Sequence, residues 1–262
     1  MTTGAERIAA AFDGHGRAAA LMPYLMGGHP DLRASTECGL AAADAGADLI
    51  ELGVPFSDPL ADGPVIHTAA TEALRQGVRL HDVLEVAREV SAQIPVVLMV
   101  YANVVLARGA ERFADEAAAA GAAGLIVPDL PYDEAAGVRA ACDAEGLALV
   151  PLVAPTTTDD RVAEIGRDAR GFVYTVSLSG TTGERAELPP ELAATVARVR
   201  DAADVPVAVG FGISTAEHAR QVAAVADGVI VGSRIVRAAG EGGAEAVGAI
   251  VRELGEGLES GA

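Results

Sequence analysis

Short, nearly continuous apolar runs alternate along the chain with longer segments in which apolar residues recur every three or four positions. The short runs are typical of strands buried on both faces of a parallel sheet, and the longer segments are typical of amphipathic helices that cover such a sheet. The pattern predicts eight strands, over residues 19–26, 48–52, 95–101, 124–127, 147–153, 171–176, 206–209 and 227–231.

Helical patterns follow these strands, and one more precedes the first. They cover residues 5–12, 31–45, 64–75, 81–93, 106–120, 133–145, 158–166 and 190–202, and two more begin near residues 214 and 233. Eight strand–helix units in 262 residues predict an α/β fold, a single (β/α)8 TIM-barrel domain over residues 1–262 with a short N-terminal helix. A doubly wound open sheet is the alternative, but it usually carries a glycine-rich fingerprint after its first strand, and Gly27-Gly28-His29-Pro30 is not one.

The composition limits the possible partners. Hydrophobic residues make up 51% of the chain and aromatic residues only 3%, so the core must be largely aliphatic. A formal net charge of −18 argues against nucleic acid or an anionic membrane as a partner, because both require a basic surface. We find neither a signal-peptide pattern nor the run of roughly 18 apolar residues that a membrane span needs, and we therefore expect a cytoplasmic protein.

The basic residues are all arginine: the chain contains 19 arginines and no lysine. This excludes Schiff-base chemistry, covalent attachment of pyridoxal phosphate to this chain and a P-loop lysine. The five histidines are scattered without metal-ligand spacing, so we predict no metal site and expect solvated surface histidines. Cys38 and Cys142 lie in alanine-rich helical patterns, which predicts two small buried thiols.

Two acidic residues stand out around the second predicted strand. Glu51 ends an apolar run, where a carboxylate is costly to desolvate and is usually kept for a use. The next residues, up to Pro64, contain three prolines and two glycines, which rule out a helix or a continued strand and predict a shaped loop. Asp62 lies in this loop. Because the carboxyl ends of all barrel strands open on one face, we expect both acids to face one small ligand there.

A phosphate site is predicted at the ends of the last two strands. Gly210-Phe211-Gly212-Ile213-Ser214 follows the seventh strand and Gly232-Ser233 follows the eighth. Glycines let the backbone approach a ligand, and the helices that follow direct N–H groups towards it, so an acidic chain without lysine could still bind a phosphate. Gly183 could add another N–H from the loop 177–189, which we expect to be a flexible lid.

The order of these motifs resembles that of the tryptophan synthase alpha chain family. The resemblance covers nearly the whole sequence and is carried by residues 51–64, Tyr101-Ala102-Asn103, Pro128-Asp129-Leu130-Pro131, the strand containing Tyr174, residues 210–214 and Gly232-Ser233. It implies a lyase that cleaves indole-3-glycerol phosphate to indole and glyceraldehyde 3-phosphate in L-tryptophan biosynthesis.

The resemblance also implies a role for each site residue. Glu51 would shuttle protons, and its apolar surroundings should raise its pKa towards neutrality. Asp62 would stay ionised and accept a hydrogen bond from the indole N–H. The remaining residues are Tyr174, which would line the indole pocket, Thr182, which would meet the aspartate when the lid closes, and Gly183, Gly212, Gly232 and Ser233, which would bind the phosphate.

A partner follows from the same resemblance. Members of this family work with a beta chain that holds pyridoxal phosphate, as an alpha2beta2 tetramer, whereas no cofactor is expected in this chain. The loop around Asp58 and the loops containing Asn103 and Pro131 are the expected contact.

Several other functions stay open or are disfavoured by the residues. A free-standing indole-glycerol phosphate lyase and a non-catalytic, phosphate-binding regulator of a partner enzyme both remain alternatives. Indole-glycerol phosphate synthase would need a catalytic lysine. The sugar-isomerising barrels of histidine synthesis would need aspartates at the first and fifth strand ends, which here read Met26-Gly27 and Val153-Ala154.

Overall fold

A closed parallel barrel forms the centre of the protein in a computed structural model that describes residues 2–176, 191–210 and 212–259. Its strand segments are β1 (Ala20–Met26), β2 (Ile50–Gly53), β3 (Val96–Met99), β4 (Gly124–Ile126), β5 (Ala148–Val150), β6 (Leu152–Val153), β7 (Val173–Val176), β8 (Val207–Gly210) and β9 (Gly228–Val231). All pairs are parallel, in the order β5-β4-β3-β2-β1-β9-β8-β7-β6.

β5 and β6 together form the fifth strand of the barrel. They are separated only by Pro151, which has no N–H to donate to a ladder. β5 pairs with β4 through Val150 and Ile126, while β6 pairs with β7 through Leu152 and Tyr174. The two ends of the strand order therefore meet in one stretch of chain, and the predicted eight-stranded (β/α)8 barrel is confirmed.

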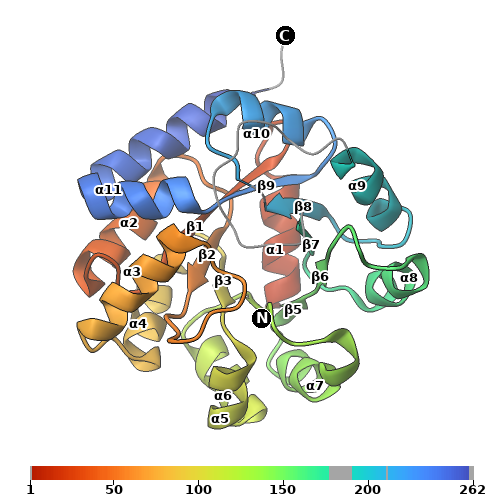
Figure 1. The fold of residues 1–262 in the computed structure, drawn as a ribbon, viewed down its shortest axis with the longest axis horizontal. Helices are drawn as coiled ribbons and strands as arrows, with labels where there is room; N and C mark the ends of the chain where they lie inside the picture. The colour runs from red at the N-terminus through yellow and green to blue at the C-terminus, as the bar shows by residue number, and fades with distance from the viewer. Residues whose placement is uncertain (1, 177–190, 211, 260–262) are drawn as a thin grey trace.

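Helices surround the strands (Figure 1). They are α1 (Gly4–Asp13), α2 (Leu32–Asp44), α3 (Pro64–Arg75), α4 (Leu80–Val90), α5 (Ala102–Arg108), α6 (Ala110–Ala119), the 3-10 turn η1 (Tyr132–Glu134), α7 (Ala136–Ala144), α8 (Asp159–Asp168), α9 (Leu192–Arg200), α10 (Ala216–Ala223) and α11 (Ser233–Glu256). The single helix predicted over residues 106–120 is wrong: α5 and α6 are separate, because Gly109 lies between them with a φ of 90°.

Alternation along each strand divides the core into two parts. Ile50 and Leu52 point outward and pack in the aliphatic layer between strands and helices. Leu49 points inward and packs in the barrel interior with Met22 and Val97. Glu51 therefore also faces the interior, where it is in register with Tyr24 of β1 and Val97 of β3.

The predicted N-terminal helix is confirmed as α1, which closes the end of the barrel where the strands begin. Its N–H at Gly4 donates to Gly146 O at 2.6 Å, just before β5. Further along the helix, Ile8 and Phe12 join the interior cluster with Phe172. Figure 1 shows α1 across the centre of the ring. The interior is therefore closed at this end, which leaves the carboxyl ends of the strands as the place for a site.

Two predictions about individual side chains have different outcomes. Cys38 and Cys142 are free and buried, as predicted. The expectation of surface histidines is wrong for His29, which is only 9% exposed because it lies between Glu72 of α3 and Gly240 of α11. Among the described residues, no helix is long and apolar enough to span a membrane.

Two helical glycines give a matched test of the packing around the barrel. A Cβ at Gly166 in α8 would overlap the backbone oxygen of Ala202, whereas a Cβ at Gly137 in α7 would meet no atom within 4 Å. We expect Gly166→Ala to lower the free energy of unfolding by about 1–3 kcal/mol through overpacking. Gly137→Ala should raise it by roughly 0.5–1 kcal/mol, because alanine favours a helix. Urea unfolding followed by circular dichroism measures both, and equal shifts of the two midpoints would contradict this packing.

Candidate active site

Glu51 is a fully buried carboxyl group on the inner face of β2. Its exposed fraction is 0%, and neither carboxylate oxygen has a hydrogen-bond partner among the described residues. Removal from water disfavours the charged form, so burial raises the pKa of Glu51 to about 8. At neutral pH the group therefore holds its proton and is close to the point at which it can lose it.

Asp62 approaches the same region from the loop between β2 and α3. Pro64 begins α3 at a position that needs no N–H, so the loop ends directly after Asp62 and Gly63. The Tyr101 hydroxyl accepts a hydrogen bond from the N–H of Ala61, the residue before Asp62, at 3.1 Å. Burial raises the pKa of Asp62, whereas the Tyr101 hydroxyl and His67 lower it.

The Tyr101 ring is itself held in place by stacking. It lies against Phe56, which belongs to the loop that carries Asp62, with the ring centroids 5.1 Å apart and the planes at 24°. Tyr101 is buried and follows β3, so it connects the loop that carries Asp62 to the barrel wall. The position of Asp62 therefore depends on tertiary contacts, whereas Glu51 is fixed by its own strand.

Two buried tyrosines stand beside the acids, and each depends on a glycine in the neighbouring strand. The Tyr24 hydroxyl lies over Gly53 of β2, and the Tyr174 hydroxyl lies over Gly210 of β8, so that a Cβ at either glycine would overlap the phenol. Burial raises the pKa of both tyrosines, and the nearby charges of Glu51 and Asp62 raise it further. The charge of each acid thus reaches both phenols, which indicates that the four side chains lie near one another.

Tyr24 is a site residue that sequence reasoning missed. The available signal was alternation: Met22, Tyr24 and Met26 of β1 share one face, and Tyr24 is the register partner of Glu51. The register itself could not be predicted from the sequence, because the pairing of β1 with β2 depends on how the whole barrel closes.

Two of the glycines predicted for phosphate binding, Gly212 and Gly232, follow β8 and β9 and therefore lie at the same end of the barrel. Gly210 ends β8, and Gly212 has a φ of 41°, in the region that favours glycine. Gly232 precedes α11, whose first residue is Ser233, so free N–H groups of a helix start lie there. A Cβ at Gly232 would lie 3.9 Å from the Tyr24 Cβ, which places this helix start beside the tyrosine wall.

Two predicted residues, Thr182 and Gly183, lie outside the described residues. Within the ranges that the structure describes, no group of three or more His, Cys, Asp or Glu side chains could hold a metal ion.

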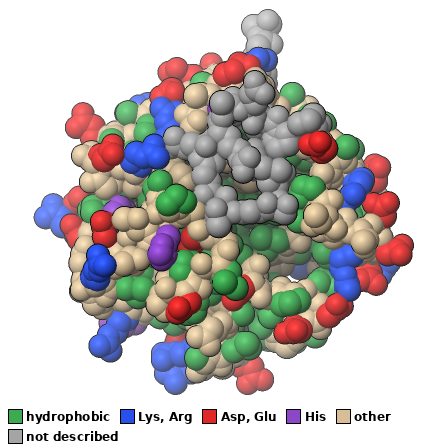
Figure 2. Space-filling view, viewed as in Figure 1, with side chains coloured by type: hydrophobic (Ala, Val, Ile, Leu, Met, Phe, Trp, Pro, Cys, Tyr) green, Lys and Arg blue, Asp and Glu red, His purple; other side chains and the backbone are tan. Residues whose placement is uncertain are grey.

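Figure 2 shows hydrophobic side chains towards the middle of the face seen in Figure 1 and charged side chains mostly around its rim. The described residues thus bring together a buried carboxyl group, a second acid on a loop, and a helix start that follows a glycine.

Comparison with known proteins agrees with this geometry. The family model for the tryptophan synthase alpha chain matches residues 12–256. A tryptophan synthase alpha chain from Synechococcus elongatus is 49% identical over 253 residues, which cover 95% of each chain. Another from Methanopyrus kandleri is 48% identical over 233 residues, covering 88% of this chain and 84% of the relative.

Solved structures give the same result. A chain of Mycobacterium tuberculosis tryptophan synthase superimposes with a TM-score of 0.92 at 42% identity, with 100% of both chains covered. A chain from a structure of the tryptophan synthase a2b2 complex of Pyrococcus furiosus has a TM-score of 0.85 at 39% identity, covering 92% of this chain and 99% of that one.

The burial of Glu51 should make stability depend on pH in a way that needs no substrate. The carboxyl pKa is near 4.5 in an unfolded chain and about 8 in the folded protein. Between these values only the folded state holds the proton, so the free energy of unfolding falls as pH rises through this window and levels off above it. In Glu51→Gln this decrease in the free energy of unfolding with rising pH should be absent.

We therefore expect the urea midpoint of Glu51→Gln, relative to the wild type, to rise steadily from pH near 4.5 to pH near 8. Glu89 is an exposed glutamate on α4, and Glu89→Gln should follow the wild type throughout. If the urea midpoints of Glu51→Gln and the wild type differ by the same amount at every pH, Glu51 does not titrate in this range.

Proposed function

Because the chain belongs to the tryptophan synthase alpha chain family, we propose that it cleaves indole-3-glycerol phosphate to indole and glyceraldehyde 3-phosphate, the lyase step of L-tryptophan biosynthesis known as the alpha reaction. The observation that carries this proposal is the buried carboxyl group of Glu51, which has no hydrogen-bond partner among the described residues and lies near Asp62. A retro-aldol cleavage of this substrate that uses neither a Schiff-base lysine nor a metal ion requires such an acid to protonate the leaving carbon.

Glu51 performs the proton transfers. Its protonated carboxyl, favoured by a pKa of about 8, delivers a proton to C3 of the indole ring, and the ring becomes a cation that can accept electrons. The carboxylate then helps to remove the proton from the hydroxyl on the adjoining glycerol carbon. The electrons of the O–H bond form the aldehyde C=O, and the bond between C3 and this carbon breaks. The electrons of the broken bond restore the indole ring.

Asp62 stabilises the charge that develops in this step. Its carboxylate accepts a hydrogen bond from the indole N–H, which becomes more acidic as the ring is protonated. Tyr24 and Tyr174 provide the aromatic wall, and their hydroxyl groups are held over Gly53 and Gly210. Thr182 would meet Asp62 when the site closes.

The phosphate group is bound by backbone amides. Gly212 and the start of α11 at Gly232 and Ser233 supply N–H groups on one side, and Gly183 supplies another. This arrangement suits a chain with a formal net charge of −18, because helix and loop dipoles attract the anion without a lysine.

A beta chain that holds pyridoxal phosphate is the proposed partner, in an alpha2beta2 tetramer, and this chain needs no cofactor of its own. The a2b2 complex of the Pyrococcus furiosus relative supports this. So do two large exposed apolar side chains near the proposed contact loops, Leu60 at 79% and Leu106 at 59% exposure. We also propose a cytoplasmic location for this biosynthetic step.

The first test compares indole release by Glu51→Gln, Asp62→Asn and Glu89→Gln. Loss of a general acid usually costs roughly 10²–10⁴-fold, so Glu51→Gln should reduce kcat by that factor with an unchanged circular dichroism spectrum. Asp62→Asn should cost about 10²-fold, since one charge-stabilising contact is lost. Glu89→Gln should equal the wild type. Full activity of Glu51→Gln would overturn the mechanism.

The second test measures indole release by the wild type alone and with an added tryptophan synthase beta chain. We expect slow release alone and a sharp increase with the partner, together with co-elution of the two chains in gel filtration. Fast release that the partner does not change would indicate a free-standing lyase. If the chain binds indole-3-glycerol phosphate but releases no indole under either condition, a non-catalytic regulator of a partner enzyme would be favoured.

A further inference from the structure

Residues 127–131, called here the β4 segment, connect β4 to η1 and support the loop that carries Asp62. The Asp129 carboxylate of this segment accepts a hydrogen bond from the backbone N–H of Ala102, with 2.8 Å between N and Oδ1. Ala102 directly follows Tyr101, whose hydroxyl accepts a hydrogen bond from the N–H of Ala61, the residue before Asp62. Two hydrogen bonds, Ala102 to Asp129 and Ala61 to Tyr101, therefore connect the β4 segment to the loop that carries Asp62.

A cavity of about 430 Å³ that is partly open to solvent adjoins the β4 segment, between α7 and α8. All five residues of the segment line it, together with apolar side chains that include Leu149, Leu152 and Ile165. Val127 and Leu130 pack in or against the aliphatic core on the other side. Towards the cavity the segment has no packing partners, so contacts at the end of the segment can decide its position.

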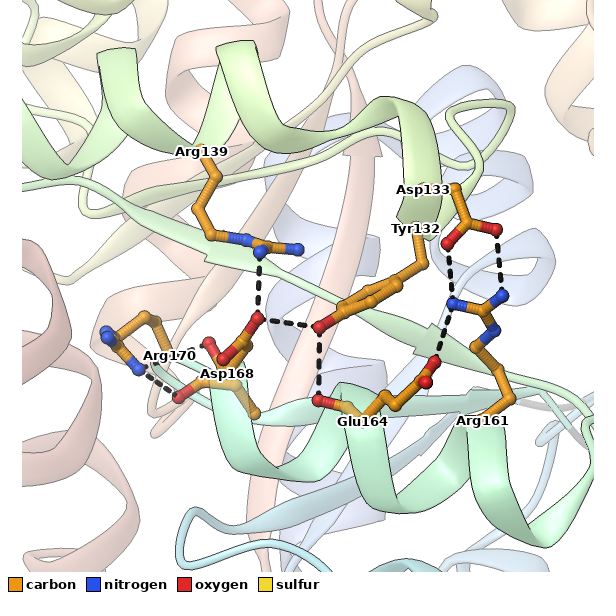
Figure 3. Close-up of polar contacts among 8 residues, drawn as sticks. Tyr132, Asp133, Arg139, Arg161, Glu164, Asp168 and Arg170 are labelled. Atoms are coloured by element: carbon orange, nitrogen blue, oxygen red, sulfur yellow. Dashed lines mark hydrogen bonds and ion pairs between the residues drawn. The ribbon is translucent and has the colours of Figure 1, made fainter.

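That interaction is a cluster around Tyr132, the residue directly after the segment (Figure 3). The Tyr132 hydroxyl donates to Asp168 Oδ2 at 2.6 Å, and Arg139 Nη1 donates to the same oxygen at 2.9 Å. The guanidinium carbons of Arg139 and Arg161 lie 4.8 and 5.2 Å from the centroid of the tyrosine ring. We call Tyr132, Arg139, Arg161 and Asp168 the Tyr132 clamp.

The clamp joins the two helices on either side of the cavity. Arg139 belongs to α7, whereas Arg161 and Asp168 belong to α8. Arg161 also makes a two-pronged ion pair with Asp133, the next residue after Tyr132, with both N–O distances 2.8 Å. Paired guanidinium–carboxylate bonds and cation–π contacts fix both the orientation and the position of the Tyr132 ring.

We propose that the Tyr132 clamp positions the β4 segment and, through the Asp129–Ala102 hydrogen bond and Tyr101, holds the loop of Asp62 in its catalytic place. This inference rests on the proposed function of Asp62. Tyr132 is thus a positioning residue. Without its ring, the segment can shift towards the cavity, and the Ala102 N–H then loses its acceptor.

Hydrogen exchange tests the structural part without any substrate. In Tyr132→Ala, the amide protons of Ala102 and Ala61 should exchange at least about tenfold faster, because local opening becomes easier. The amide of Val97 in β3 should exchange as in the wild type. Unchanged exchange at Ala102 in the folded variant would overturn the inference, whatever the activity of the protein.

Steady-state kinetics test the consequence for catalysis. Misplacement of a catalytic group by a fraction of an ångström is costly, so Tyr132→Ala should lower kcat about tenfold with little change in KM. Asp168→Asn, which keeps the ring, should give a smaller loss in the same direction. Glu37→Gln is the control, because it weakens the exposed ion pair between Arg33 and Glu37 within α2, which no contact of the clamp involves.

A double mutant separates positioning from general destabilisation. If the clamp acts through Asp129, Tyr132→Ala should have almost no further effect on kcat in an Asp129→Ala background. It should still lower the urea midpoint there, because the hydrogen bond to Asp168 and the cation–π contacts of the ring are lost. Additive losses of kcat would contradict this route. A wild type that releases no indole would instead reject the proposed function, and the exchange data would still decide on the clamp.

Discussion

The burial of one carboxyl group on the inner face of β2 is the constraint on which the site depends. An ionised carboxylate without partners is costly in an apolar interior, so the group keeps its proton up to a pH of about 8. A barrel can carry this cost because the aliphatic layer outside the strands, with Ile50 and Leu52 on the same strand, stabilises the fold independently. The inward-facing position of Glu51 is thus not needed for the stability of the fold.

The second acid follows the opposite design. Asp62 lies on a loop, and its position depends on Tyr101, on the stacking of Phe56 and on the hydrogen bond between Ala102 and Asp129. Strand residues are positioned by a backbone ladder, whereas loop residues need side-chain contacts from other elements. Glu51 is thus positioned by its own strand, whereas the position of Asp62 can be changed by substitutions in several other segments.

The sequence predicts the barrel and both acids because these depend on local signals. Apolar runs and helical periods identify the units, and the run of prolines and glycines after Glu51 identifies a shaped loop. Tyr24 and His29 depend instead on which segments meet in space. Tyr24 reaches the site through its register with Glu51, and His29 is buried by α3 and α11, which are distant in sequence. Similarly, the Tyr132 clamp joins two helices whose packing no local pattern reveals.

The distribution of charge fits an anionic substrate better than the net charge suggests. Ionised side chains lie mostly around the rim of the face in Figure 2, where solvent and salt screen them. Near the strand ends, a neutral Glu51 adds no negative charge, and the start of α11 presents a partial positive charge. The pKa of Glu51 thus has two consequences. It keeps on Glu51 the proton that the proposed reaction needs, and it removes a repulsion that an ionised carboxylate would exert on a phosphate bound nearby.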